Sequence, residues 1–210
     1  MEWFGQLIQF VLHLDAHLLG FATAHGNWIY GLLFVIIFCE TGLVVTPFLP
    51  GDSLLFVAGT VAGAGALDVN LMVVVLIVAA ILGDSLNFSI GRWIGPRVFR
   101  FEDSWLFRRR YLDQANAFYL RHGGKTIVIA RFVPIVRTYA PFVAGACGMD
   151  YRRFLGFNVI GGVMWIALLA YAGYFFGGLA VVKNNLTLVT IGIIVLSLMP
   201  AVVEYLRNRK

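Results

Sequence analysis

The sequence predicts an all-α polytopic membrane protein: a single domain built as an inverted repeat, with transmembrane helices, two re-entrant helical segments and an N-terminal interfacial helix. Three observations lead to this fold class. Of the 210 residues, 60% are hydrophobic and only 13% charged, whereas an average soluble domain has roughly 25% charged residues. Several apolar runs are about 20 residues long, enough to cross a hydrocarbon core of roughly 30 Å. Finally, one unusual pattern occurs twice.

Each copy of this pattern begins Phe-x-Pro, continues with Phe-Val-Ala-Gly, passes an Asp and ends in two glycines. The copies are Phe48, Pro50, 56–59, Asp68, Gly91 and Gly95, and then Phe132, Pro134, 142–145, Asp150, Gly173 and Gly177. From the Asp to the first Gly the interval is 23 in both (68 to 91, 150 to 173). Glycines four residues apart are typical of helix-packing faces. Paired repeats broken by Pro and Gly point to a transporter's midplane binding site.

The elements of the first half follow in order. Residues 1–26 contain an amphipathic helix (2–24) suited to the membrane interface. The first repeat, 27–91, holds a span at 27–46, which Pro47 ends, and a second span at 69–91. Between them, 47–67 is broken by Pro and Gly, and its apolar piece is too short to cross. Non-helical backbone at membrane depth must be buried in protein or line a cavity, so this segment is predicted to be re-entrant.

The second half repeats this order after a polar loop at 92–125, which contains a short amphipathic helix at 105–122. The second repeat, 126–178, holds a broken, re-entrant segment at 126–149 and a span at 154–178. A last span at 186–206 completes the chain. All 16 basic residues lie in 92–210, which carries a formal +11 against −6 for 1–91. The positive-inside rule therefore places the loop, the C-terminus and the N-terminus in the cytoplasm and makes the two copies inverted. A nucleic-acid partner is not expected, because the basic residues flank apolar spans.

Four charged residues interrupt the apolar runs: Glu40, Asp52, Arg131 and Arg137. Glu40 lies about 20 Å along its span, at 1.5 Å per residue. Charge inside the membrane is costly, and such residues are functional candidates. If both broken segments reach the midplane, the two carboxylates and two guanidiniums can neutralise each other.

Each of these residues also has a structural interpretation. Asp52 suits a helix N-cap, Glu40 a structural ion pair, and Arg131 a side chain that snorkels to the cytoplasmic face. Candidate cavity-lining residues are Ser53, Thr138, Tyr139, Asp84 and Asn158. Asp84 and Asn87, near the cytoplasmic end of their span, also suit polar capping.

The sequence offers little support for metal or enzyme chemistry. His13 and His17 are four residues apart but lack a third ligand, and Cys39 and Cys147 lack partners at metal-ligand spacing. A nucleophile–base motif and a P-loop are also missing from the sequence. We therefore expect no catalytic residues, no metal and no cofactor.

The motifs resemble those of the DedA family of bacterial inner-membrane proteins. The resemblance rests on Phe38–Gly42, Phe48–Ser53, Gly123–Lys125, Arg131–Thr138 and Phe142–Gly145. It implies a polytopic bundle with two re-entrant segments and dependence on the proton motive force. It also implies that Glu40 and Asp52 are the essential acidic pair and Arg131 and Arg137 the arginine pair. Family members are implicated in recycling undecaprenyl phosphate, and others in cation/proton exchange.

Three functions remain open. The first is a flippase for a polyprenyl phosphate, with arginines that bind phosphate bidentately and carboxylates that couple transport to protons. The second is a cation/proton antiporter, whose carboxylates bind cation and proton alternately. The third is a non-transporting scaffold for envelope or division machinery. The partners are then the lipid, protons and the bilayer of the inner membrane, and a homo-oligomer is left open.

Overall fold

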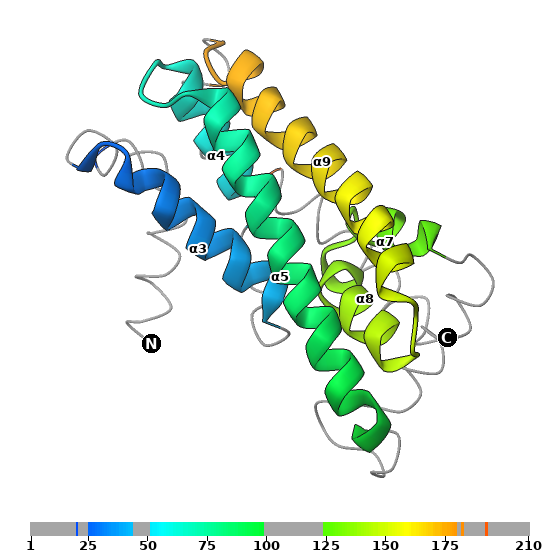
Figure 1. Ribbon diagram of the computed structural model, residues 1–210. Helices are drawn as coiled ribbons and strands as arrows, with labels where there is room; N and C mark the ends of the chain where they lie inside the picture. The colour runs from blue at the N-terminus through cyan, green and yellow to red at the C-terminus, as the bar shows by residue number, and fades with distance from the viewer. Residues whose placement is uncertain are drawn as a thin grey trace, which may run out of the picture. The chain divides into compact units, whose positions relative to one another are not determined.

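The computed structural model describes residues 20, 25–43, 51–98, 124–179, 182 and 192. This part of the chain is helical and contains no strand (Figure 1). Its helices are α3 (Trp28–Gly42), α4 (Gly51–Gly63), α5 (Val69–Val98), α7 (Lys125–Ala130), α8 (Pro134–Ala146) and α9 (Tyr151–Phe176). The predicted all-α class is confirmed. The expected helices at 2–24, 105–122 and 186–206 lie outside the described residues.

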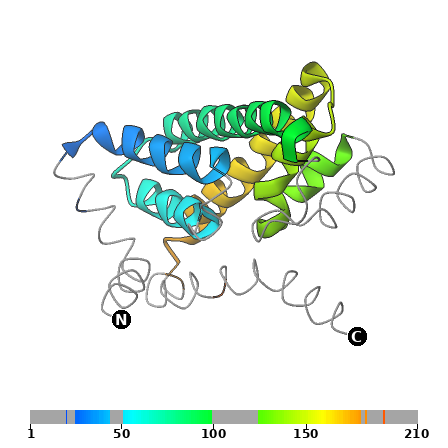
Figure 2. The same ribbon diagram turned by 90° about the horizontal axis from the view of Figure 1, so that it is seen from below.

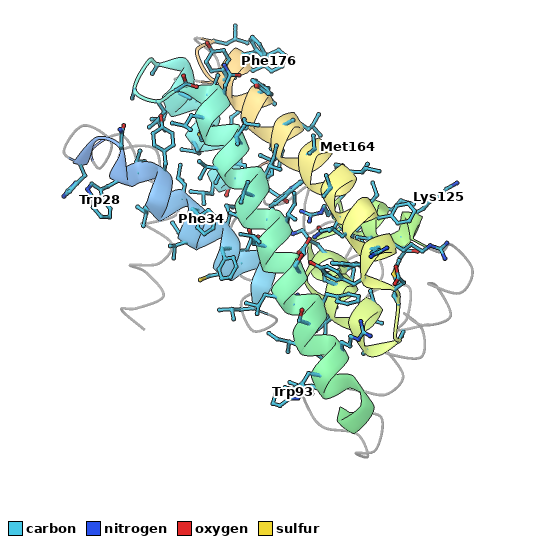
Figure 3. All side chains as sticks on the ribbon, in the orientation of Figure 1. Trp28, Phe34, Trp93, Lys125, Met164 and Phe176 are labelled. Carbon is cyan, nitrogen blue, oxygen red and sulfur yellow. The ribbon has the colours of Figure 1, made fainter. Side chains whose placement is uncertain are left out.

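Two of these helices are long and apolar enough to cross a membrane, over Val69–Ile94 and Tyr151–Phe176. At 1.5 Å per residue, 26 residues extend about 39 Å, more than a hydrocarbon core of roughly 30 Å. Along α5, large apolar side chains are exposed at spacings of three and four: Leu71, Val74, Val78, Leu82 and Leu86. Trp93 on α5 and Met164 on α9 also project outward (Figure 3). Such an apolar exterior is suited to lipid.

Both long helices begin at an aspartate of the repeated pattern. The Asp68 carboxylate accepts a hydrogen bond from the Leu71 amide at 2.9 Å, and Asp150 accepts one from the Arg153 amide at 3.0 Å. These are N-cap bonds, which satisfy amides that a helix start leaves without an intrahelical acceptor. The aspartates therefore fix where α5 and α9 begin.

Two helix ends differ from the sequence-based expectation. The helix of the first span ends at Gly42 rather than at Thr46, and 44–50 lie outside the described residues. In contrast, α5 continues to Val98, although the loop was expected from Arg92. A basic residue indicates where a chain reaches the membrane surface, and a helix can continue beyond that point.

The shorter helices cannot cross a bilayer alone. Helices α4 and α8 have 13 residues each, about 20 Å, and α7 has six. The second broken segment divides into α7 and α8, which pack next to each other (Figure 1). The break lies at 131–133, and α8 begins at Pro134, where a helix start does not require the missing N–H. Whether these segments re-enter from one side of a membrane stays a prediction.

The helices belong to two compact units. Unit 1 comprises Met1–Ile36, Phe48–Leu76 and Trp165–Lys210, and unit 2 comprises Ile37–Pro47 and Ile77–Met164. In unit 1, α4 lies alongside the C-terminal part of α9 (Figure 2). In unit 2, α8 packs against the C-terminal part of α5.

The repeated pattern makes the same contact once in each unit. In unit 1, a Cβ atom on Gly173 would overlap the backbone carbonyl oxygen of Phe56, the first residue of Phe-Val-Ala-Gly. In unit 2, a Cβ atom on Gly91 would overlap the carbonyl oxygen of Phe142. The interval of 23 therefore separates the N-cap aspartate of each long helix from the glycine at which a neighbouring backbone can approach closely. The prediction that these glycines form packing faces is confirmed for Gly91, Gly173 and Gly177, and nothing in the described part tests Gly95.

Candidate functional site: buried charges in an apolar helical protein

The first ion pair of unit 2 joins α3 to α8. Arg137 Nη2 donates to Glu40 Oε1 at 2.6 Å, and the two side chains are only 8% and 4% exposed. Arg137 lies in the first turn of α8, directly after the break at 131–133. The break thus places this arginine beside the carboxylate of α3. Of the predicted charged residues, these two pair with each other.

The second ion pair joins the end of α7 to α5. Arg131, the C-cap residue of α7, donates through Nη2 to a carboxylate oxygen of Asp84 and to Asn158 Oδ1. Asn158 is held in turn, because its amide donates to the Ile81 carbonyl at 3.2 Å. On α9, a Cβ atom at Gly161 would lie 3.0 Å from Arg131 Cδ. The glycine therefore leaves room for the stem of the arginine.

These contacts correct two sequence-based interpretations. Arg131 does not snorkel to a surface, because it is 3% exposed and its guanidinium is held by Asp84 and Asn158. Asp84 is not a capping residue, because it lies in the middle of α5 and is 2% exposed. The signal for its role was its position: it lies on the helix face opposite the exposed Leu82 and Leu86. A carboxylate on the inward face of an apolar helix needs a partner.

Asn87, unlike Asp84, was missed as a site residue. Its side-chain amide donates to the backbone carbonyls of Thr41 at 3.2 Å and Thr138 at 2.9 Å. Thr41 follows Glu40 in the chain, and Thr138 follows Arg137. One amide on α5 therefore fixes the backbone next to both members of the first ion pair.

Asp52 belongs to unit 1. It lies in the first turn of α4, where a carboxylate interacts favourably with the positive end of the helix dipole. Trp165 on α9 donates its indole N–H to Asp52 Oδ1 at 2.9 Å. Because α4 begins at Gly51, Asp52 lies inside the helix and not at the predicted N-cap position, and its part in proton coupling stays a prediction. That all four predicted charged residues lie at one place also stays a prediction.

The remaining predicted lining residues are within or near these clusters. Ser53, next to Asp52, is buried, and so is Thr138, next to Arg137. Tyr139 is half-buried. Among the described residues, no group of three or more His, Cys, Asp and Glu side chains could hold a metal ion. His13 and His17 lie outside that part.

Among the described residues, each of these two buried guanidiniums pairs with one carboxylate. Removing one partner of a buried ion pair costs about 3–5 kcal/mol, because the other charge is left uncompensated. The same guanidiniums are the groups best suited to bind a phosphate, whose oxygens they match bidentately. An entering anion therefore has to exchange with a carboxylate or be accompanied by a proton.

An apolar exterior, two helices of spanning length and ion pairs buried between helices define a helical membrane protein. Comparison with known proteins agrees with this class. The model of the VTT domain matches residues 49–175. The chain is 55% identical to the protein DedA of Escherichia coli (strain K12), over 97% of this chain and 94% of that protein.

Further relatives are also membrane proteins. An uncharacterized membrane protein of Mycobacterium leprae (strain TN) is 43% identical over 80% of this chain and 76% of its own. The inner membrane protein YqjA of Escherichia coli (strain K12) is 36% identical over 84% and 80%, respectively. No solved structure matches. The chain belongs to the DedA family.

Proposed function

We propose that this protein is a transporter of the bacterial inner membrane, driven by the proton motive force, that flips a lipid phosphate such as undecaprenyl phosphate. The observation that carries the proposal is the pair of buried arginines, each neutralised by a carboxylate. A guanidinium that one carboxylate neutralises can exchange that carboxylate for the oxygens of a phosphate, which it matches bidentately. A phosphate that binds to these arginines must replace or protonate a carboxylate, and this links transport to protons.

The topology inferred from the sequence completes the proposal. Two inverted copies with re-entrant segments would bring both breaks to the bilayer midplane, with both termini in the cytoplasm. Glu40 and Asp52 would carry the protons, and Arg131 and Arg137 would bind the phosphate. Moving one net charge through the membrane changes the free energy by about 2.3 kcal/mol per 100 mV. The membrane potential therefore acts on any step in which a net charge crosses, and the pH gradient acts on the proton that accompanies the headgroup.

The test is a liposome assay with purified full-length protein and fluorescent undecaprenyl phosphate in one leaflet, with and without a pH gradient. We expect flipping that the gradient stimulates and that Arg137→Ala and Glu40→Gln abolish. The matched control is Arg152→Ala, because Arg152 is exposed. Cation-driven proton flux without flipping would favour the antiporter. Neither activity in folded protein would leave the scaffold.

A further inference from the structure

Asp84 adds a third carboxylate to the charges that the sequence put forward. It is a buried residue of α5, and one of its oxygens meets one nitrogen of Arg131. Asn158 accepts from the same nitrogen and is anchored to the backbone of α5. Arg131 is therefore held between a neutral amide with a fixed position and a carboxylate whose charge can change.

We propose that Asp84 is the exchangeable counter-ion of Arg131: it yields the guanidinium to the incoming phosphate and takes up a proton as it does so. The inference rests on the proposed function and assigns to that site a proton-coupling residue besides Glu40 and Asp52. Asn158, which cannot titrate, keeps Arg131 in place during the exchange.

The geometry of the contact favours exchange. Asp84 binds Arg131 through one oxygen and one nitrogen, whereas a phosphate can engage a guanidinium through two parallel hydrogen bonds. On α9, Gly161 faces the stem of Arg131, and Gly162 faces its guanidinium. The guanidinium can therefore change partner without leaving this position.

The carboxylate that is left behind cannot stay charged. A carboxylate at 2% exposure with no cation beside it is strongly disfavoured, and such groups become neutral instead. Among the described residues, Arg137 of α8 and Glu40 of α3 also act electrostatically on this pair. They neutralise each other through their own ion pair, and α9 contributes the uncharged Asn158. The proton therefore goes to Asp84.

The exchange balances in atoms and charge. Before binding, the carboxylate of Asp84 and the guanidinium of Arg131 sum to zero. Afterwards, a phosphate monoanion pairs with the guanidinium, and Asp84 is a neutral carboxylic acid. One anion and one proton enter together, so the charge of the cluster is unchanged.

The experiment measures proton uptake when the purified full-length protein in nanodiscs binds farnesyl phosphate. Calorimetry at neutral pH in two buffers of different ionisation enthalpy gives the protons taken up per bound probe. We expect the wild type to take up about one proton more than Asp84→Asn, because protonation of the phosphate itself, which is partly a dianion at neutral pH, is common to both proteins. Asp84→Asn should also bind the probe about tenfold more tightly, because the competing carboxylate is gone. The matched control is Asp68→Asn, at the exposed start of the same helix.

Infrared difference spectroscopy on the wild type keeps the test independent of whether Asp84→Asn folds. A carboxylic acid band should appear when farnesyl phosphate binds, and Asp84→Glu, which keeps the charge, should shift it. Binding with equal proton uptake in the wild type and in Asp84→Asn overturns the role of Asp84 and leaves the proposed function standing. A wild type that binds no farnesyl phosphate overturns both.

Discussion

Replacing Gly173 by Ala tests the close contact between α4 and α9. A Cβ atom at this position would overlap the carbonyl oxygen of Phe56 and lie 2.9 Å from its carbonyl carbon, closer than real Cβ contacts come. The obstacle is backbone, so no side-chain rotation can relieve it. The two helices have to separate, and the buried side chains between them lose contacts.

The magnitude follows from two opposing terms. Forcing an extra carbon into a packed interior typically costs about 1–3 kcal/mol. Alanine in place of glycine within a helix returns roughly 0.5–1 kcal/mol. We therefore expect Gly173→Ala to lower the free energy of unfolding by about 1–2 kcal/mol. For a protein of this size that is about 2–8 °C in Tm.

The matched control lies in the same helix. Gly156→Ala introduces the same methyl group where nothing lies within 4 Å, so only the gain in helix propensity remains. Thermal unfolding of the detergent-solubilised variants, followed by tryptophan fluorescence, should show Gly173→Ala below the wild type and Gly156→Ala at or slightly above it. Equal Tm values for the two variants would refute the close packing of α4 on α9.

Two further predictions concern single hydrogen-bond donors. Asn87→Asp replaces the amide that donates to two backbone carbonyls. The free energy of unfolding in detergent should therefore fall by at least about 2 kcal/mol. Asn70→Asp, at an exposed position, is the control and should change it little. Trp165→Phe replaces the buried indole by a smaller phenyl ring and removes the donor to Asp52, so a chemical denaturation series should show a loss of at least about 1.5–3 kcal/mol in the free energy of unfolding. Trp93→Phe, at an exposed position, is its control, and an equal loss there would contradict this assignment.

The break in the second segment shows how well local sequence signals worked. Pro134 indicated an interruption, and α7 and α8 are separated there. Proline and glycine act on their own backbone, so their effect is readable without knowing the neighbours. The same holds for Asp68 and Asp150, whose carboxylates bind amides three residues further along.

Ion-pair partners could not be read in this way. Arg131 pairs with Asp84, 47 residues away, and Trp165 donates to Asp52, 113 residues away. The sequence put forward a set of buried charges with two carboxylates. The third carboxylate, Asp84, becomes apparent only in the tertiary structure, where α5 faces the end of α7.

By itself, the sequence determined a helical membrane protein, its duplicated pattern and the four charged residues of its apolar segments. These follow from composition, periodicity and spacing, which act along the chain. Tertiary structure decided which charge neutralises which, that Asp84 is the partner of Arg131, that Asn87 lies beside the first ion pair, and why the repeated interval ends at Gly91 and Gly173. Those outcomes depend on which helix faces meet, because the cost of burying a charge or admitting a backbone is set by the atoms across the contact.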